Sequence, residues 1–306
     1  TFREFHCMSN YISRHVLVIP FYYIGGIIHK EQFMVILLMS LLMAGTAVNS
    51  YSVCRRLLGE DKIIVIPILA SFLSLPLIGY SMQVYPEVPA IFILSYLMKV
   101  YLDSKVGIIK SILIGISMAF LGWLHVKFLA LAIPFLILFY FSKDVYKSDN
   151  MRYIPLLIFI FAIAGMSLSF YYLYGSLSFS SQYPSVPISI KSIKYFPQRL
   201  LKNFLDQHDG IFFYSPFYVF SIAGFISLFK SGVLNEHSRK RLEMMMATFL
   251  GFIFITSLLS VDDGRSIPPR FLVPVLPLLV IAISAFVRFN GNKFIKVLFI
   301  VLSICS

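Results

Sequence analysis

The sequence predicts an all-α membrane protein with several transmembrane helices. Of its 306 residues, 58% are hydrophobic and only 13% are charged, and the mean hydropathy is +0.84. A soluble domain carries about 25% charged residues and could not bury this much apolar surface, so soluble, disordered and fibrous classes are excluded. The apolar residues form long runs rather than alternating with polar ones, which favours helices over a β-barrel.

Ten apolar runs separate along the chain, and each predicts one helix. A helix that crosses a bilayer needs about 20 residues, so the runs 107–122 and 128–141 are short. They predict a hairpin whose tip, residues 123–127, stops below the external surface. The earlier run 16–28 contains Pro20 and indicates an interfacial or re-entrant piece. The ten runs are roughly 33–53, 63–80, 88–102, 107–122, 128–141, 154–174, 211–229, 244–261, 271–287 and 294–306.

Basic residues concentrate in alternate connections between the runs. Because short cytoplasmic connections are rich in Lys and Arg, these connections are predicted to be cytoplasmic and the others external. The same rule explains the net charge of +12, so no nucleic-acid partner is expected. The cytoplasmic set is Arg55, Arg56, Lys62, Lys99, Lys105, Lys110, Lys143, Lys147, Arg152, Lys230, Arg239, Lys240, Arg241, Arg288, Lys293 and Lys296.

We expect one transmembrane domain over residues 1–306 and no soluble domain. Residues 1–32 would end the first external loop, 33–306 would form the helical bundle, and 175–210 would be the longest external loop. There is no signal-peptide pattern, and the run 294–306 is cut short. We therefore expect a fragment that lacks its first span and its C-terminal part.

The long external loop contains a predicted amphipathic helix at 197–206. Pro197 suits the first turn of a helix, and Gly210 follows shortly after its end. Such a helix would lie flat on the membrane surface. Its apolar stripe is formed by residues 196, 200, 201, 204 and 205.

No short motif predicts a resident cofactor. Cys7, Cys54 and Cys305 are scattered without metal or redox spacing, and we expect them to be inert. Nucleotide-binding glycine loops and zinc motifs are absent from the sequence. A divalent cation held by external carboxylates is the one cofactor that the charged loops suggest.

Glu87 is the first candidate site residue, because it begins a helix on the predicted external side. Its carboxylate would face a cavity as a base, a metal ligand or an acceptor contact. The alternative is a solvated helix N-terminus, where the helix dipole favours an acid.

Lys127 and His125 lie at the tip of the short hairpin. A lysine held below the surface needs an anionic partner. The alternative is a lysine whose ammonium reaches the interface. His125 is either a site residue or a hydrogen-bonded structural group.

Two further external segments carry clustered charges. Asp206, His208 and Asp209 could bind a metal or transfer protons. In the last loop an adjacent acid pair could ligate a hard cation, and two arginines could grip a phosphate. Solvated loop charges are the alternative in both segments. The residues of the last loop are Asp262, Asp263, Arg265 and Arg270.

Five segments, taken in order, carry a family resemblance. They are similar to the end of a first external loop, an acidic helix start, a segment ending in lysine, a Gly-hydrophobic-aromatic-Pro helix start, and an Arg-aromatic-Leu-x-Pro-x-Leu-Pro helix. Together they resemble the GT-C superfamily of membrane glycosyltransferases, and most closely its bacterial protein-mannosyltransferase-like and lipid A aminoarabinose transferase-like branch. The segments are 15–26, 85–87, 122–127, 209–216 and 269–277.

The resemblance implies transfer of a hexosyl or pentosyl group from a polyprenyl-phosphate-linked sugar. The acceptor would be a glycolipid, glycan or protein, on the external face of a prokaryotic plasma membrane. Lys127 and Arg270, with Arg265, would bind the donor phosphate. The family's catalytic acid lies just after the first span, so we expect it upstream of this chain, and Glu87 is the only candidate here.

Two alternatives stay open. A membrane transporter or lipid flippase would use the same external charges as a substrate gate. An O-antigen polymerase or ligase would be another membrane sugar enzyme. An acidic motif just after an upstream first helix would favour the glycosyltransferase, and its absence would favour transport.

Overall fold

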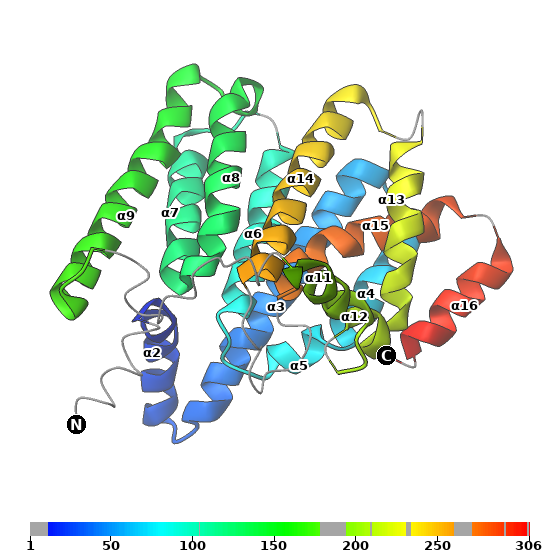
Figure 1. The fold of residues 1–306 in the computed structure, drawn as a ribbon, viewed down its shortest axis with the longest axis horizontal. Coiled ribbons are helices and arrows are strands. Elements are labelled where there is room, and N and C mark those ends of the chain that lie inside the picture. The colour runs from blue at the N-terminus through cyan, green and yellow to red at the C-terminus, as the bar shows by residue number, and fades with distance from the viewer. Residues whose placement is uncertain are drawn as a thin grey trace. The chain divides into compact units, whose positions relative to one another are not determined.

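A computed structural model describes residues 12–103, 105–177, 194–208, 210–230, 234–259, 271–290, 292–304 and 306. These residues are helical almost throughout, as Figure 1 shows, and they form no strand beyond one isolated bridge between Val106 and Tyr146. The predicted all-α class is confirmed. The chain divides into two compact units, residues 1–38 with 103–194 and residues 39–102 with 195–306, and each is described by itself.

The first unit is built around a helical hairpin. The predicted hairpin is confirmed: α7 and α8 are joined by a single 3-10 turn, η2. Helix α7 packs closely on α9 at Gly115. The approach needs glycine, since a Cβ at this position would lie 2.9 Å from the Cα of Pro155 and would clash. The elements of the first unit are α2 (Ile12–Ile27), the start of α3 (Glu31–Leu58), α7 (Ile108–Leu124), η2 (Val126–Phe128), α8 (Leu129–Phe141), η3 (Lys143–Val145), η4 (Asp149–Arg152) and α9 (Tyr153–Tyr174).

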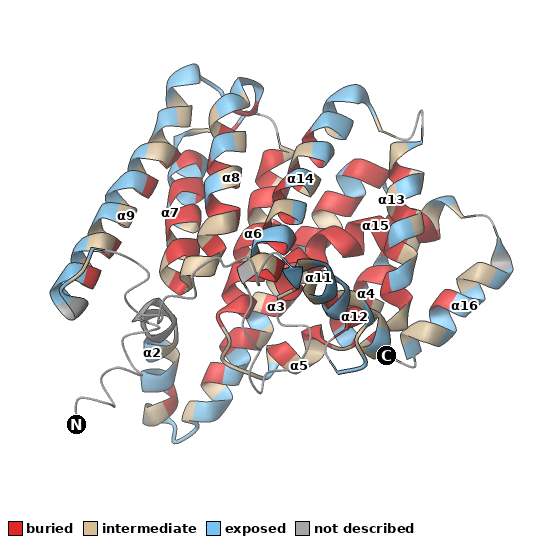
Figure 2. Ribbon diagram, in the orientation of Figure 1, coloured by how far each residue is buried: buried red, intermediate tan, exposed pale blue. Residues whose placement is uncertain are grey.

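The second unit holds the rest of α3 and packs around α15, which is buried from Leu276 to Val287 (Figure 2). Helix α13 lies directly against α15 at Gly224. Besides the end of α3, the second unit contains η1 (Lys62–Ile64), α4 (Val65–Leu73), α5 (Leu77–Ser81), α6 (Glu87–Tyr101), α11 (Phe196–Leu205), α12 (Ile211–Tyr214), η6 (Pro216–Val219), α13 (Phe220–Phe229), α14 (Glu236–Leu259), η7 (Val273–Val275), α15 (Leu276–Phe289) and α16 (Lys293–Ile304).

Three described helices are long and apolar enough to cross a membrane: Glu31–Leu58, Asp149–Tyr172 and Glu236–Leu258. Seven further apolar helices have 10–17 residues. The chain is therefore a membrane protein by helix length and composition. Ten spans, the single domain and the charge-based orientation stay predictions.

Two predicted runs are broken in the structure. The run 63–80 divides into α4 and α5 before Pro76, and the run 211–229 divides into α12, η6 and α13 at Pro216. Proline has no backbone N–H and disfavours helical geometry in the residue before it, so an apolar run does not guarantee one helix. By contrast, α2 continues through Pro20.

Candidate functional site

The candidate site in the second unit begins with Glu87, the first residue of α6. Glu87 is 0% exposed, and Val88, Ala90 and Ile91 beside it are fully buried too. A solvated position for this carboxylate is excluded. The N-terminal end of a helix favours a negative charge, which offsets part of the cost of burying this carboxylate.

Helix α6 packs against α5 and against η7. Element η7 begins at Val273, three residues after Arg270 in the chain, so the described part of the segment 269–277 packs against the helix that Glu87 begins. Arg270 itself lies outside the described residues, as do Asp209, Asp262, Asp263 and Arg265.

The predicted amphipathic helix is confirmed as α11, and two of its polar residues, Arg199 and Asn203, face the protein. The Asn203 amide donates to Ser257 Oγ of α14 at 3.2 Å, and Arg199 donates to the Leu258 carbonyl at 3.3 Å. Part of its apolar stripe faces outward, since Leu201 is 56% and Leu205 is 64% exposed. This arrangement suits a helix between a polar protein surface and lipid.

The two broken runs meet in this unit. Ser215, just before the break at Pro216, donates its hydroxyl to the carbonyl of Leu75, which lies just before Pro76. A carbonyl freed by a helix break loses its helical partner, and the Ser215 hydroxyl supplies one here. The sequence indicated each proline but not this pairing, because no local pattern relates the two segments.

His208 belongs to the turn between α11 and α12. Its backbone N–H donates to Asp206 Oδ1 at 2.7 Å, and the Tyr214 hydroxyl donates to its carbonyl at 3.0 Å. These contacts are those of an Asx turn, so Asp206 and the His208 backbone have local structural roles. The exposed imidazole remains a candidate. Across the part of the chain that the structure describes, no three His, Cys, Asp or Glu residues are grouped as metal ligands.

In the first unit, His125 shapes the hairpin tip that carries Lys127. The Nδ1 atom of His125 accepts the backbone N–H of Lys127 at 3.1 Å and caps η2, which supports the structural interpretation of His125. The indole of Trp123 donates to the Ala162 carbonyl of α9 at 3.2 Å and fixes the tip. The half-buried Lys127 ammonium lies 5.1 Å from the Phe128 ring centre.

No family model, curated protein or solved structure matches this chain. The family resemblance therefore depends on the five sequence segments alone. Of their key residues, Glu87, His125 and Lys127 fall within the described part of the chain.

Proposed function

We propose that the protein is an integral-membrane glycosyltransferase that moves a sugar from a polyprenyl-phosphate donor to an acceptor on the external face. The observation that carries this proposal is the fully buried Glu87 carboxylate, on a helix packed beside the element that follows Arg270. Burying a carboxylate is costly unless it is compensated, and such groups concentrate at functional sites.

The length of α6 adds support. Glu87 and Lys99 are 12 residues apart on α6, which is about 18 Å at 1.5 Å per residue. The hydrocarbon core is about 30 Å thick. If α6 crosses the bilayer along its normal, its two charged ends cannot both reach the headgroups. An ionisable group held at membrane depth is a functional-site hypothesis by default.

The chemistry follows from these groups. An acceptor hydroxyl would attack the anomeric carbon of the sugar, and the bond to the lipid phosphate would break. Glu87, or an acid outside this chain, would take the hydroxyl proton. Arg270 and Arg265 would stabilise the negative charge that grows on the departing phosphate. Lys127 keeps the phosphate-binding role that the resemblance implies, and a cation at Asp262 and Asp263 stays a prediction.

A donor-cleavage assay tests the proposal. The full-length protein in nanodiscs would be given polyprenyl-phosphate sugars labelled in the sugar, and released polyprenyl phosphate would be measured. Arg270→Ala and Lys127→Ala should each lower the rate by at least about tenfold, since a charge-assisted hydrogen bond contributes about 1.5–3 kcal/mol. The matched controls are Arg239→Ala and Lys143→Ala, whose side chains are exposed. Full activity in both test variants would refute the phosphate-binding roles.

Transport is the second candidate, and the broken helices favour it. Discontinuous helices such as α4–α5 and α12–α13 are typical of transporter binding sites. A flippase would move the labelled lipid across the bilayer intact. Cleavage of the donor supports the transferase, whereas movement without cleavage supports the flippase.

A further inference from the structure

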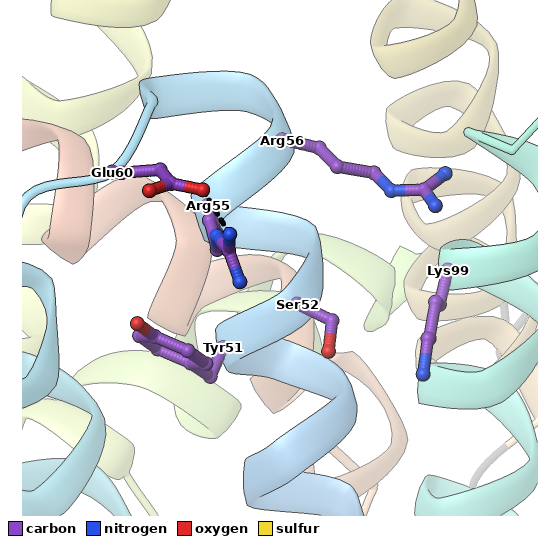
Figure 3. Close-up of a pocket in the computed structure, with 6 residues that line it drawn as sticks. All are labelled: Tyr51, Ser52, Arg55, Arg56, Glu60 and Lys99. Atoms are coloured by element: carbon purple, nitrogen blue, oxygen red, sulfur yellow. Dashed lines mark hydrogen bonds and ion pairs between the residues drawn. The ribbon is translucent and has the colours of Figure 1, made fainter.

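A cavity of about 430 Å³ lies in the second unit at the C-terminal ends of α3 and α6. Three of its lining side chains are cations and one is a carboxylate, so its net charge is positive. The lining residues, drawn in Figure 3, are Tyr51, Ser52, Arg55, Arg56, Glu60 and Lys99.

Helices α3 and α6 run side by side in the same direction up to this cavity. A Cβ at Gly45 would lie 2.6 Å from the Phe92 ring, and the Asn49 amide donates to Ser95 Oγ at 3.3 Å. One further turn along each helix brings Ser52 and Lys99 to the cavity. Because both helices end here, their terminal carbonyls favour cations even without a ligand.

The charges of the cavity are unevenly compensated. Arg55 forms an ion pair with Glu60. Lys99 is half-buried and makes no ion pair or hydrogen bond with any other residue in the described ranges. In Figure 3, Arg56 and Ser52 extend toward the side of α3 where Lys99 lies, while Arg55 and Glu60 meet on the other side. An anion between Arg56 and Lys99 could form charge-assisted hydrogen bonds with both cations.

An exposed apolar stripe of α3 leads into the cavity. Leu41, Ala44 and Val48 recur at helical spacing on one face, and Val48, which is 61% exposed, is one turn before Ser52. An acyl chain lying along this stripe would bring its phosphate to the cavity. A soluble anion would gain nothing from the stripe.

We infer that this cavity binds the phosphate of an anionic phospholipid, with an acyl chain along the stripe of α3. Basic pockets between transmembrane helices bind such headgroups. The site is independent of the proposed transferase function, since Lys99 is about 18 Å along α6 from Glu87.

Lipid binding to the full-length protein in non-ionic detergent tests the inference. Native mass spectrometry would follow the binding of short-chain phosphatidylglycerol and of phosphatidylcholine with the same chains. Phosphatidylglycerol should bind at least about tenfold more tightly. Lys99→Gln should weaken it by about tenfold, the loss expected for one charge-assisted contact. Lys99→Arg should keep the binding.

Arg239→Gln is the matched control, because Arg239 is an exposed cation in the same unit and pairs with Glu243 at 3.0 Å. An unchanged unfolding midpoint shows that Lys99→Gln folds normally, and Arg56→Gln is the second test variant. Equal affinity for the two lipids, or wild-type binding by both glutamine variants, would overturn the inference. Displacement of phosphatidylglycerol by inorganic phosphate at equal concentration would show a soluble-anion site and overturn the lipid assignment.

Discussion

Replacing Gly224 by alanine should destabilise the second unit, because α13 and α15 touch there through their backbones. A Cβ at Gly224 would lie 1.9 Å from the carbonyl oxygen of Ala282 and 2.4 Å from its carbon. Ordinary contact begins at 3.4 Å, so the helices would have to separate by about 1.5 Å. Helix α15 is buried from Leu276 to Val287 and has little room to move. Overpacking of this kind costs about 1–3 kcal/mol.

Gly251→Ala is the matched control within the same unit. Gly251 lies within α14, and a Cβ there would meet nothing within 4 Å. Alanine should stabilise that helix by about 0.5–1 kcal/mol. Unfolding by sodium dodecyl sulfate in mixed micelles would measure both variants of the full-length protein. We expect Gly224→Ala to unfold at lower denaturant than wild type and Gly251→Ala at equal or higher denaturant. The packing described here would be refuted if Gly224→Ala were as stable as Gly251→Ala.

Three further outcomes follow from the structure. Arg241→Leu should lower the unfolding free energy by about 1.5–3 kcal/mol, because the 5%-exposed Arg241 donates to the Tyr101 carbonyl at 2.8 Å. In the same dodecyl sulfate titration, Arg239→Leu, at an exposed position, should lower it by less than about 1 kcal/mol. Asn203→Leu leaves the buried Ser257 hydroxyl without its partner and should make the α11 segment more sensitive to protease, and exposed Gln198→Leu should not. In a Cys7→Ser, Cys305→Ser background, a membrane-impermeant maleimide should label Met82→Cys from the external side and Lys105→Cys only from the cytoplasmic side. The reverse pattern would contradict the predicted membrane orientation.

The helices could be predicted from sequence because lipid exposure leaves long apolar runs, and each of the ten runs contains helix. The breaks at Pro76 and Pro216 were missed as helix ends. Hydropathy records whether a residue suits lipid, but it does not show whether a distant hydroxyl such as Ser215 can satisfy a freed carbonyl.

The candidate site could be predicted only in part. The burial of Glu87 could not be predicted, because it depends on how α6 packs in the fold, and η7, one of the elements packed on α6, lies far from it in sequence. The inward contacts of Arg199 and Asn203 on α11 were missed for the same reason, since the apolar stripe alone suggested a helix lying on lipid. His125 and Asp206 show that a polar residue beside a turn is often used by the turn itself.

Donor cleavage by the Glu87→Gln variant tests the central claim most directly. Glutamine keeps the size of the side chain and removes its charge and its ability to accept a proton. The full-length variant in nanodiscs would be compared with wild type and with Glu243→Gln, an exposed carboxylate of the same unit. We predict that wild type and Glu243→Gln release polyprenyl phosphate, and that Glu87→Gln is slower by about 10²-fold or more, the contribution typical of a positioned acid or base. Wild-type turnover by Glu87→Gln would contradict the role of Glu87, and a wild type that releases no polyprenyl phosphate would contradict the transferase itself.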